Sequence, residues 1–282
     1  MEILVCVKRV PTVGGKIVVT PDGQEVDTRA SGFSVSPHEE CAVEEAVQIT
    51  ERAGGSVSVL TLGPADAIEQ LRDALALGAH RAVLLETDGR EWGPVATAAA
   101  IAEAVEELGT ATFPLVFFGT ESADTGGYQV GVRVAHALRR PCVTGIKRLE
   151  VAGGRLRAWR ERAGSQELFD VALPAAVSVR EGINLTRYPS LPGRLRARRA
   201  EITVLRPQWR ADGLRKTGLR VPAGSARRAQ VLGHGTDAVP ALLQVLTEIG
   251  VLPSAAGAGA SAGAGAADAA GAGAQAGAGI AP

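Results

Sequence analysis

Two patterns of apolar and polar positions alternate through the first 120 residues. Short runs rich in β-branched residues are typical of buried parallel strands, and they cover residues 2–7, 56–62, 81–85 and 114–118. Segments with helical spacing lie between them at residues 39–52, 65–77 and 94–108, and each is followed by a glycine that can end a helix. This alternation predicts an α/β fold with three layers, α/β/α, around a mostly parallel sheet.

The start of the first helix carries its own local signal. Ser36 is followed by Pro37, His38 and Glu39, which has the form of a capping box with proline at the first helical position. The sequence therefore predicts that the side chains of Ser36 and Glu39 cap this helix.

The pattern beyond residue 142 favours antiparallel additions to the sheet. Residues 143–151 and 156–161 flank Ala-Gly-Gly-Arg, which predicts a hairpin, and residues 175–179 and 201–205 predict two further strands, the second closing the sheet. An arginine-rich arm at 207–232 and an amphipathic helix at 237–249 follow. This helix packs either on its own domain or on a partner.

These segments give three regions. Residues 1–206 form the α/β domain, including a loop at 182–199, and residues 207–252 form a C-terminal arm and helix. Residues 253–282 are almost entirely Ala and Gly, which cannot bury enough apolar surface to offset the entropy of ordering, so a disordered tail is expected.

Charge and cysteine content limit the kinds of partner and the cellular compartment expected for the chain. Lys and Arg together number 30, as do Asp and Glu, so the chain offers no electrostatic case for binding nucleic acid or an anionic membrane. Glutamates gather between residues 39 and 51 and arginines beyond residue 180, a distribution that suits a protein interface. Three scattered cysteines imply no disulfide framework and favour a cytoplasmic location. Neither a metal-ligand spacing nor a membrane span is evident.

Four loops follow predicted strands at the edge of the sheet where α/β proteins bind ligands, at residues 8–15, 33–39, 62–66 and 119–131. The last of them combines four glycines with hydroxyls and a carboxylate, and a predicted helix at 129–138 follows directly. Glycine allows close approach of the backbone and a helix N-terminus attracts anions, which indicates a phosphate site. An ordinary glycine-rich connection is the alternative. No pairing of nucleophile and base can be assembled, so the chain is not expected to be an enzyme.

Residues 184–199 read N-L-T-R-Y-P-S-L-P-G-R-L-R-A-R-R. Pro189 and Pro192 restrict the backbone on both sides of Ser190 and Leu191, which predicts a stiff, non-helical arch with an exposed leucine. Four arginines follow and are expected to face water or a partner; they are Arg194, Arg196, Arg198 and Arg199. The arch is therefore a candidate docking element, with an inert polar loop as the alternative.

The motif R-Y-P-S-L-P with its basic run resembles a signature of the electron-transfer flavoprotein beta subunit. Further blocks that resemble this family are V-C-V-K-R-V, S-P-H-E-E-C-A-V-E-E-A, L-G-P and A-L-A-L-G-A, in that order along the chain. The resemblance implies a heterodimer with an alpha subunit that holds most of the FAD, and a structural AMP bound by the beta chain. It also implies electron transfer from acyl-CoA or other flavin dehydrogenases to a quinone oxidoreductase.

The resemblance also assigns residues to these roles. The partner-docking residues would be Tyr188, Leu191, Arg194, Arg196 and Arg199. The nucleotide contacts would be Cys6, Ser36, Pro37, His38, Glu39, Leu62, Ser122, Ala123, Asp124, Thr125, Gly126, Gly127, Tyr128, Gln129, Val130, Gly131, Val132 and Arg133.

The chain departs from the family pattern at the expected nucleotide site. Ser36 stands where Asn is common, and Thr125 and Gly126 follow Asp124 where further aspartates are usual. Two alternatives therefore stay open: a second FAD in place of AMP, as in electron-bifurcating relatives, or a nucleotide-binding sensor without redox partners.

Overall fold

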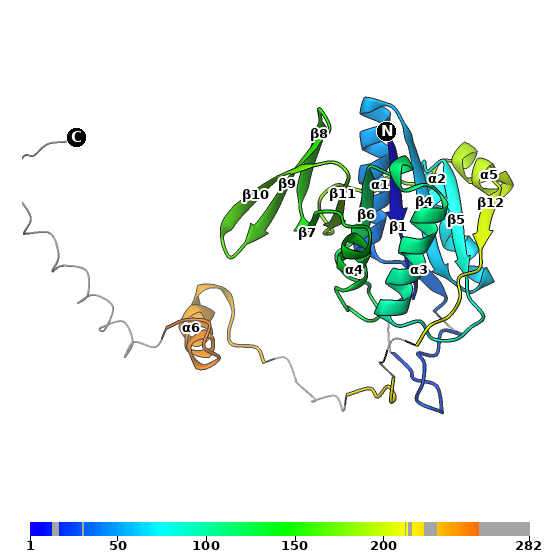
Figure 1. Ribbon diagram of the computed structural model, residues 1–282. Coiled ribbons are helices and arrows are strands. Elements are labelled where there is room, and N and C mark those ends of the chain that lie inside the picture. Colours follow the sequence, from blue (N-terminus) through cyan, green and yellow to red (C-terminus); the bar gives the residue numbers. More distant parts are fainter. Residues whose placement is uncertain (13–16, 30, 212, 214–215, 223–229, 254–282) are drawn as a thin grey trace, which may run out of the picture. The chain divides into compact units, whose positions relative to one another are not determined.

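Seven strands form a single sheet in which every pair of neighbours runs parallel (Figure 1). The computed structural model describes residues 1–12, 17–29, 31–211, 213, 216–222 and 230–253. The order across the sheet is β12-β5-β4-β1-β6-β11-β7. The strands are β1 (Glu2–Cys6), β4 (Ser56–Gly63), β5 (Arg81–Glu86), β6 (Leu115–Gly119), β7 (Cys142–Ile146), β11 (Ala175–Val179) and β12 (Ile202–Leu205).

Helices cover both faces of this sheet, which confirms the three-layer α/β/α fold. They are α1 (Pro37–Ala53), α2 (Ile68–Leu77), α3 (Pro94–Glu107), α4 (Val130–Ala137) and α5 (Leu191–Arg199), with short 3-10 turns η1 (Ala65–Ala67) and η2 (Thr110–Thr112). One apolar cluster joins the sheet to α1 and α2, and a second joins its other face to α3 and α4. The first four predicted strands and the first three predicted helices are thus present, with ends shifted by a few residues.

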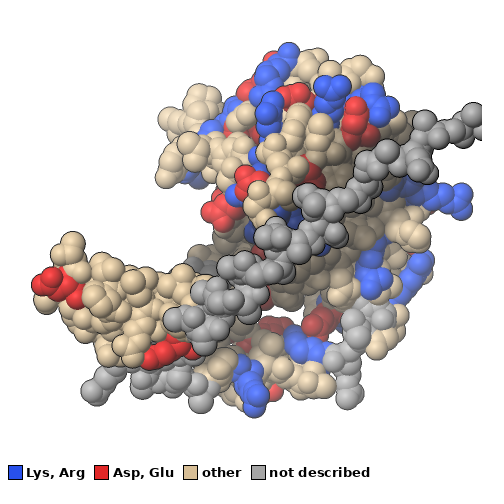
Figure 2. Space-filling model, turned by 90° about the vertical axis from the view of Figure 1, so that its left-hand side faces the viewer, with Lys and Arg blue, Asp and Glu red and all other residues tan. Residues whose placement is uncertain are grey.

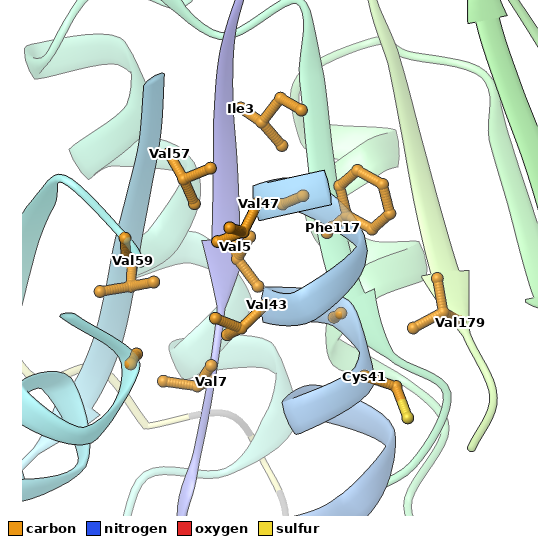
Figure 3. Packing of buried hydrophobic residues seen from close by; sticks show 14 of the residues in the cluster. Ile3, Val5, Val7, Cys41, Val43, Val47, Val57, Val59, Phe117 and Val179 are labelled. Atoms are coloured by element: carbon orange, nitrogen blue, oxygen red, sulfur yellow. The ribbon is translucent and has the colours of Figure 1, made fainter. Parts of the chain in front are cut away.

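The central strand shows why its sequence is apolar without interruption. Ile3 and Val5 point into the cluster under α1, whereas Leu4 and Cys6 point into the cluster under α3. A strand buried on both faces has no solvent side to carry polar residues. Figure 3 shows Val43 and other side chains of α1 lying against β1 and its neighbours.

The expected antiparallel character of the strands beyond residue 142 is wrong for three of them. β7, β11 and β12 join the main sheet in parallel, because their direction is set by the path of the crossover between strands, which a local pattern does not contain. The expected strand at 143–151 is divided between β7 and β8 (Arg148–Ala152).

Antiparallel pairing occurs in two small sheets. The predicted hairpin is confirmed: β8 pairs with β9 (Arg155–Arg162) across Gly153 and Gly154, whose φ angles are 58° and 73°. A third strand, β10 (Ser165–Ala172), completes this sheet. The other small sheet pairs β2 (Arg9–Pro11) with β3 (Phe33–Val35), inside two segments that were expected to be loops.

Charges of both signs are interspersed on the face of the molecule shown in Figure 2. In the β8–β10 sheet, for example, Arg155 pairs with Asp170 at 2.6 Å and Arg160 with Glu167 at 2.7 Å. Such pairing leaves no uniformly positive surface on this small sheet.

Contacts divide the chain into two units, Met1–Val221 and Pro222–Pro282. The second unit contains η3 (Gly235–Ala238) and α6 (Val239–Glu248), a helix with no buried residue and with Leu242 and Leu243 about half exposed. The domain limits expected from the sequence stay predictions, and residues 254–282 of the expected tail lie outside the described residues.

None of the helices in the described ranges has both the length and the apolar character needed to cross a lipid bilayer.

Candidate functional site

The strand order places a topological switch point at β1. Strands β4 and β5 lie on one side of β1, and β6 and β11 lie on the other. In parallel α/β sheets, ligands bind beyond the carboxyl ends of the strands at such a point. Here the residues after β1 and β6 meet the N-terminus of α1.

Two side chains at the start of α1 join these segments together. The Ser36 Oγ accepts a hydrogen bond from the backbone N–H of Ala123 at 3.0 Å, and the Glu39 Oε2 accepts one from the backbone N–H of Lys8 at 2.9 Å. Both residues are buried. The predicted capping box is half formed. The Glu39 carboxyl accepts from the Ser36 backbone N–H as well as from Lys8, but Ser36 makes no capping hydrogen bond to its own helix, because its hydroxyl binds the loop after β6, where a backbone donor would otherwise lack a partner.

Lys8 connects β1 to the loop that follows β6. Its ammonium group lies 2.6 Å from the Asp124 carboxylate and 3.5 Å from the Thr125 hydroxyl. Burial raises the pKa of Asp124, but the hydrogen bond and charge of Lys8 outweigh that effect and hold the pKa below its ordinary value. The Ser122 and Thr125 hydroxyls lie 2.9 Å apart in the same loop. One ammonium, one carboxylate and two hydroxyls thus gather at the switch point.

A second group of contacts surrounds His38. Its Nδ1 accepts a hydrogen bond from the backbone N–H of Glu181 at 2.8 Å, and its Nε2 lies 3.5 Å from the Glu121 carboxylate. A hydrogen bond with Glu121 raises the pKa of Tyr128. Tyr128 has a φ of 56°, a left-handed conformation that is uncommon for a side chain of this size, and it is largely exposed. The hydrogen bond between His38 and Glu181 thus joins the loop after β11 to the same site.

Glu39 is the most perturbed carboxyl group of the site. Burial raises its pKa to about 8, against the opposing effects of the Lys8 backbone N–H and the Lys8 charge. The nearby Cys6 thiol is also buried, and its pKa is raised by burial and by the proximity of Glu39. Both groups are therefore neutral at pH 7 and add no charge to the site.

The end of β6 lies so close to α1 that only glycine fits there. A Cβ at Gly119 would lie 2.6 Å from Glu39 Cγ and 3.2 Å from both the Glu39 backbone N and His38 Cβ. We expect Gly119→Ala to lower the free energy of unfolding by about 1–3 kcal/mol, since overpacking displaces the N-terminus of α1. Urea unfolding of the purified chain measures this change.

Gly127→Ala is the matched control for stability, because a Cβ at Gly127 meets no atom within 4 Å. Its unfolding free energy should stay within about 0.5 kcal/mol of the parent chain. Equal losses in the two variants would contradict the close approach at Gly119.

The other expected nucleotide contacts are distributed over three environments. Cys6, Leu62 and Val130 pack in the apolar cluster that also holds Phe118. Gln129 accepts hydrogen bonds from the Arg133 guanidinium at 2.9 and 3.2 Å on α4, which begins one residue after its expected start. Of the remaining expected contacts, Pro37 is the first residue of α1, and the others lie in the loop after β6 or in α4; they include Gly126, Gly127, Gly131 and Val132.

The polar contacts also identify residues that the sequence analysis did not single out, namely Lys8, Glu121 and Glu181. Lys8 could have been found, because it is the first charged residue after the central strand. Glu181 could not, since it contributes a backbone N–H from a position 143 residues away from His38.

The expected docking arch is in part a helix. Leu191 is the first residue of α5, and the Ser190 Oγ caps this helix by accepting from the Gly193 backbone N–H at 3.1 Å. Proline is favoured at such a start, so Pro192 supports the helix instead of preventing it. The prediction of a non-helical arch is wrong for Leu191, whereas its exposure is confirmed: Leu191 is 70% exposed and Tyr188 94%.

One of the arginines of α5 also binds the chain itself. Arg196 donates a hydrogen bond to the backbone carbonyl of Leu75 at the end of α2, at 3.2 Å. All four arginines, Arg194, Arg196, Arg198 and Arg199, are exposed. The basic run therefore serves both to fasten the helix and to present positive charge.

Taken together, the polar groups at the switch point can hydrogen-bond a ligand that carries hydroxyls and an anion, as a nucleotide does. Within the described ranges, no group of three or more His, Cys, Asp or Glu side chains is arranged to hold a metal ion.

Comparison with known proteins decides the family. Residues 25–208 match the electron transfer flavoprotein domain. The chain is 35% identical over 245 residues to the electron transfer flavoprotein subunit beta of Mycobacterium tuberculosis, which covers 83% of this chain and 91% of that protein. This chain belongs to the electron transfer flavoprotein beta subunit family.

Two further relatives show the breadth of that family. The beta subunit of Bacillus subtilis is 32% identical over 207 residues, covering 73% of this chain and 79% of the relative. Protein FixA of Rhizobium meliloti is 32% identical over 235 residues, covering 81% and 77%. As a member of this family, the chain is a subunit of an electron carrier and not an enzyme, as the sequence predicts.

Proposed function

We propose that this beta chain forms a heterodimer with an alpha subunit, binds AMP at the switch point, and encloses one side of the FAD that the alpha subunit holds. The observation that carries the proposal is the convergence of Lys8, Ser36 and Asp124 beyond the carboxyl ends of β1 and β6. Hydroxyls and a carboxylate suit the ribose of AMP, and the backbone at a glycine-rich helix start suits its phosphate.

The same chain offers a surface for the donor of electrons. Leu191 and Tyr188 are exposed, and so are Arg194, Arg196 and Arg199 on α5. An apolar anchor surrounded by charge is the usual anatomy of a specific interface. We assign this surface to docking of acyl-CoA dehydrogenases or other flavin dehydrogenases, with a quinone oxidoreductase as the acceptor.

The C-terminal segment is assigned to the alpha subunit. Helix α6 exposes Val239, Leu242 and Leu243, each between 45% and 49%, and has no buried residue. An amphipathic helix with an uncovered apolar side favours a partner that covers it. A cytoplasmic location is proposed for the heterodimer on the basis of its three scattered cysteines, all free in the structure.

Nucleotide content tests the proposal directly. The chain is co-expressed with its alpha subunit, the purified complex is denatured, and the released FAD and AMP are quantified. Equal amounts of FAD and AMP, one of each per heterodimer, are expected. Two FAD per heterodimer would support a bifurcating carrier, and AMP without any complex would support a nucleotide sensor.

A paired variant links this measurement to the site. Lys8→Gln combined with Asp124→Asn removes the charges at the switch point and leaves the net charge unchanged, so the AMP content should fall while FAD is retained. Arg148→Gln combined with Glu150→Gln neutralises an exposed ion pair on β8 and serves as the control. Full AMP content in the Lys8 and Asp124 variant would contradict the assigned site.

A further inference from the structure

The stretch that precedes the docking helix is fastened to α1. The side-chain N–H of Asn184 donates to the Cys41 backbone carbonyl and to the Glu45 carboxylate, both at 3.0 Å. Three residues later, Arg187 reaches Glu44 and Glu51 on the same helix. The glutamates of α1, which the sequence suggested for a protein interface, are therefore partly engaged within the chain.

Arg187 makes these contacts with all three of its guanidinium nitrogens. Its Nε donates to Glu44 at 2.9 Å, one terminal nitrogen donates to Glu51 at 2.7 Å, and the other donates to Glu44 at 3.0 Å and Glu51 at 2.9 Å. The Arg187 backbone N–H also donates to Glu44 at 3.2 Å. This planar, two-sided arrangement uses the geometry that distinguishes arginine from lysine.

Glu44 is the buried member of this contact, whereas the side chains of Arg187 and Glu51 reach the surface. The Glu44 side chain is 3% exposed. Burial would raise the pKa of Glu44, but hydrogen bonds from Arg187 and Gln48 outweigh burial and lower it. Glu44 is consequently ionised at neutral pH and depends on Arg187 for its charge partner.

The other end of the docking segment is fastened to α2. A Cβ at Gly193 would lie 2.6 Å from the Ala76 carbonyl oxygen, so α5 packs directly on the backbone at the end of α2. Ala197 is buried in this contact, and the Arg72 guanidinium donates to the Ala197 carbonyl at 2.5 Å. Residues 188–191 are thus held between two fixed ends.

The side chains between and beside these ends point into solvent. Leu185 is 93% exposed, Tyr188 94% and Leu191 70%. A flexible segment would lose conformational entropy when such side chains are ordered by a partner, whereas a segment fixed in advance avoids most of that loss.

We propose that Arg187 is a positioning residue for electron-donor docking: it clamps residues 184–188 onto α1 through Glu44 and Glu51, and it does not itself contact the partner. The inference rests on the docking function proposed above. Because four of its five guanidinium N–H groups donate to Glu44 or Glu51, the side chain cannot form the paired hydrogen bonds that arginine makes with a carboxylate of the dehydrogenase.

The test uses the FAD-loaded heterodimer and its reduction by an acyl-CoA dehydrogenase with its acyl-CoA substrate. Arg187→Gln removes the clamp but leaves Glu44 charged, so the combined variant Arg187→Gln, Glu44→Gln, Glu51→Gln is made as well to avoid a buried unpaired charge. In both variants, the apparent KM for the flavoprotein should rise about tenfold, with kcat at saturation and FAD content within about twofold.

A double variant separates positioning from direct contact. Glu44→Leu with Glu51→Ala removes the acceptor oxygens, which glutamine would keep, and leaves Arg187 in place and free to reach a partner. A positioning role predicts the same rise in KM as in the triple variant, because the three residues act as one unit. Normal KM in this double variant, together with a raised KM in Arg187→Gln, would show that Arg187 binds the partner and would overturn the inference.

Two further variants keep the outcomes distinct. Arg155→Gln with Asp170→Asn neutralises an exposed pair on the β8–β10 sheet and should leave KM unchanged. Leu191→Ala tests docking itself. If it has normal KM, the docking function fails; if it is impaired while the clamp variants are normal or lose only thermal stability, the positioning role alone fails.

Discussion

Replacing Leu191 by alanine is expected to lower kcat/KM for reduction of the heterodimer by its flavin dehydrogenase about 30-fold, as loss of a central anchor residue does at protein interfaces. The amounts of FAD and AMP should stay at the parent level. Stopped-flow reduction at several concentrations of the heterodimer measures the rate, and nucleotide release measures the content.

The size of this effect follows from the surroundings of Leu191. It is the first residue of α5, 70% exposed, and it lies beside Tyr188, which is 94% exposed. Burying a leucine in a partner removes its whole apolar surface from water, a gain of about 1.5–3 kcal/mol. Because most of the side chain is open to solvent, its removal leaves no internal cavity and should not destabilise the fold.

Leu168 offers a matched control on another surface. It is 57% exposed on β10, so Leu168→Ala removes a similar side chain away from α5. Its kcat/KM should equal that of the parent. A comparable loss in both variants would indicate a nonspecific effect of surface leucines, and no loss in Leu191→Ala would contradict the docking surface.

The elements that are predictable from sequence are those whose signal is local. The central strand β1 is apolar throughout because both its faces are buried, and α1 has helical spacing with Gly54 at its end. The position of the glycine-rich loop after β6 is also given by the residues of that segment alone. For these elements, the residues within one segment determine the outcome.

Features that depend on distant parts of the chain could not be predicted in this way. Ser36 and Glu39 have the spacing of a capping box, yet the Ser36 hydroxyl binds Ala123 and the Glu39 carboxyl also binds Lys8. The cationic Arg187 looks available in sequence, but Glu44 neutralises it from 143 residues away. Tertiary contacts of buried polar groups override local preference wherever they satisfy more hydrogen bonds.

Burial of Glu39 should make the stability of the chain dependent on pH. Its pKa is about 8 in the folded state and 4.5 in an ordinary carboxyl group, so the folded state binds the proton more tightly. The contribution of Glu39 to the free energy of unfolding is therefore fully present below about pH 4.5. It declines as pH rises and levels off above about pH 8. Between pH 5 and 8, this one group should cost about 3 kcal/mol of unfolding free energy.

Glu39→Gln should remove most of that decline. The amide oxygen of glutamine can still accept the hydrogen bond from the Lys8 backbone N–H, but the side chain has no proton to lose. The variant should be more stable than the parent at pH 8.5 and nearly equal to it at pH 5. Urea unfolding of the purified chain at both pH values gives the two differences.

Two charged side chains and one thiol lie close to Glu39. Lys8 and Asp124 face Glu39 across the site, and the Cys6 thiol lies beneath it. These groups are present in both the parent and Glu39→Gln, so their contributions largely cancel in the difference. Glu106→Gln, at an exposed position of α3, should show no such difference between the two pH values. If the stability of the parent chain does not fall between pH 5 and 8 relative to Glu39→Gln, then Glu39 is already ionised in the folded chain at pH 5. Lys8 would then stabilise the charge of Glu39 more strongly than burial opposes it.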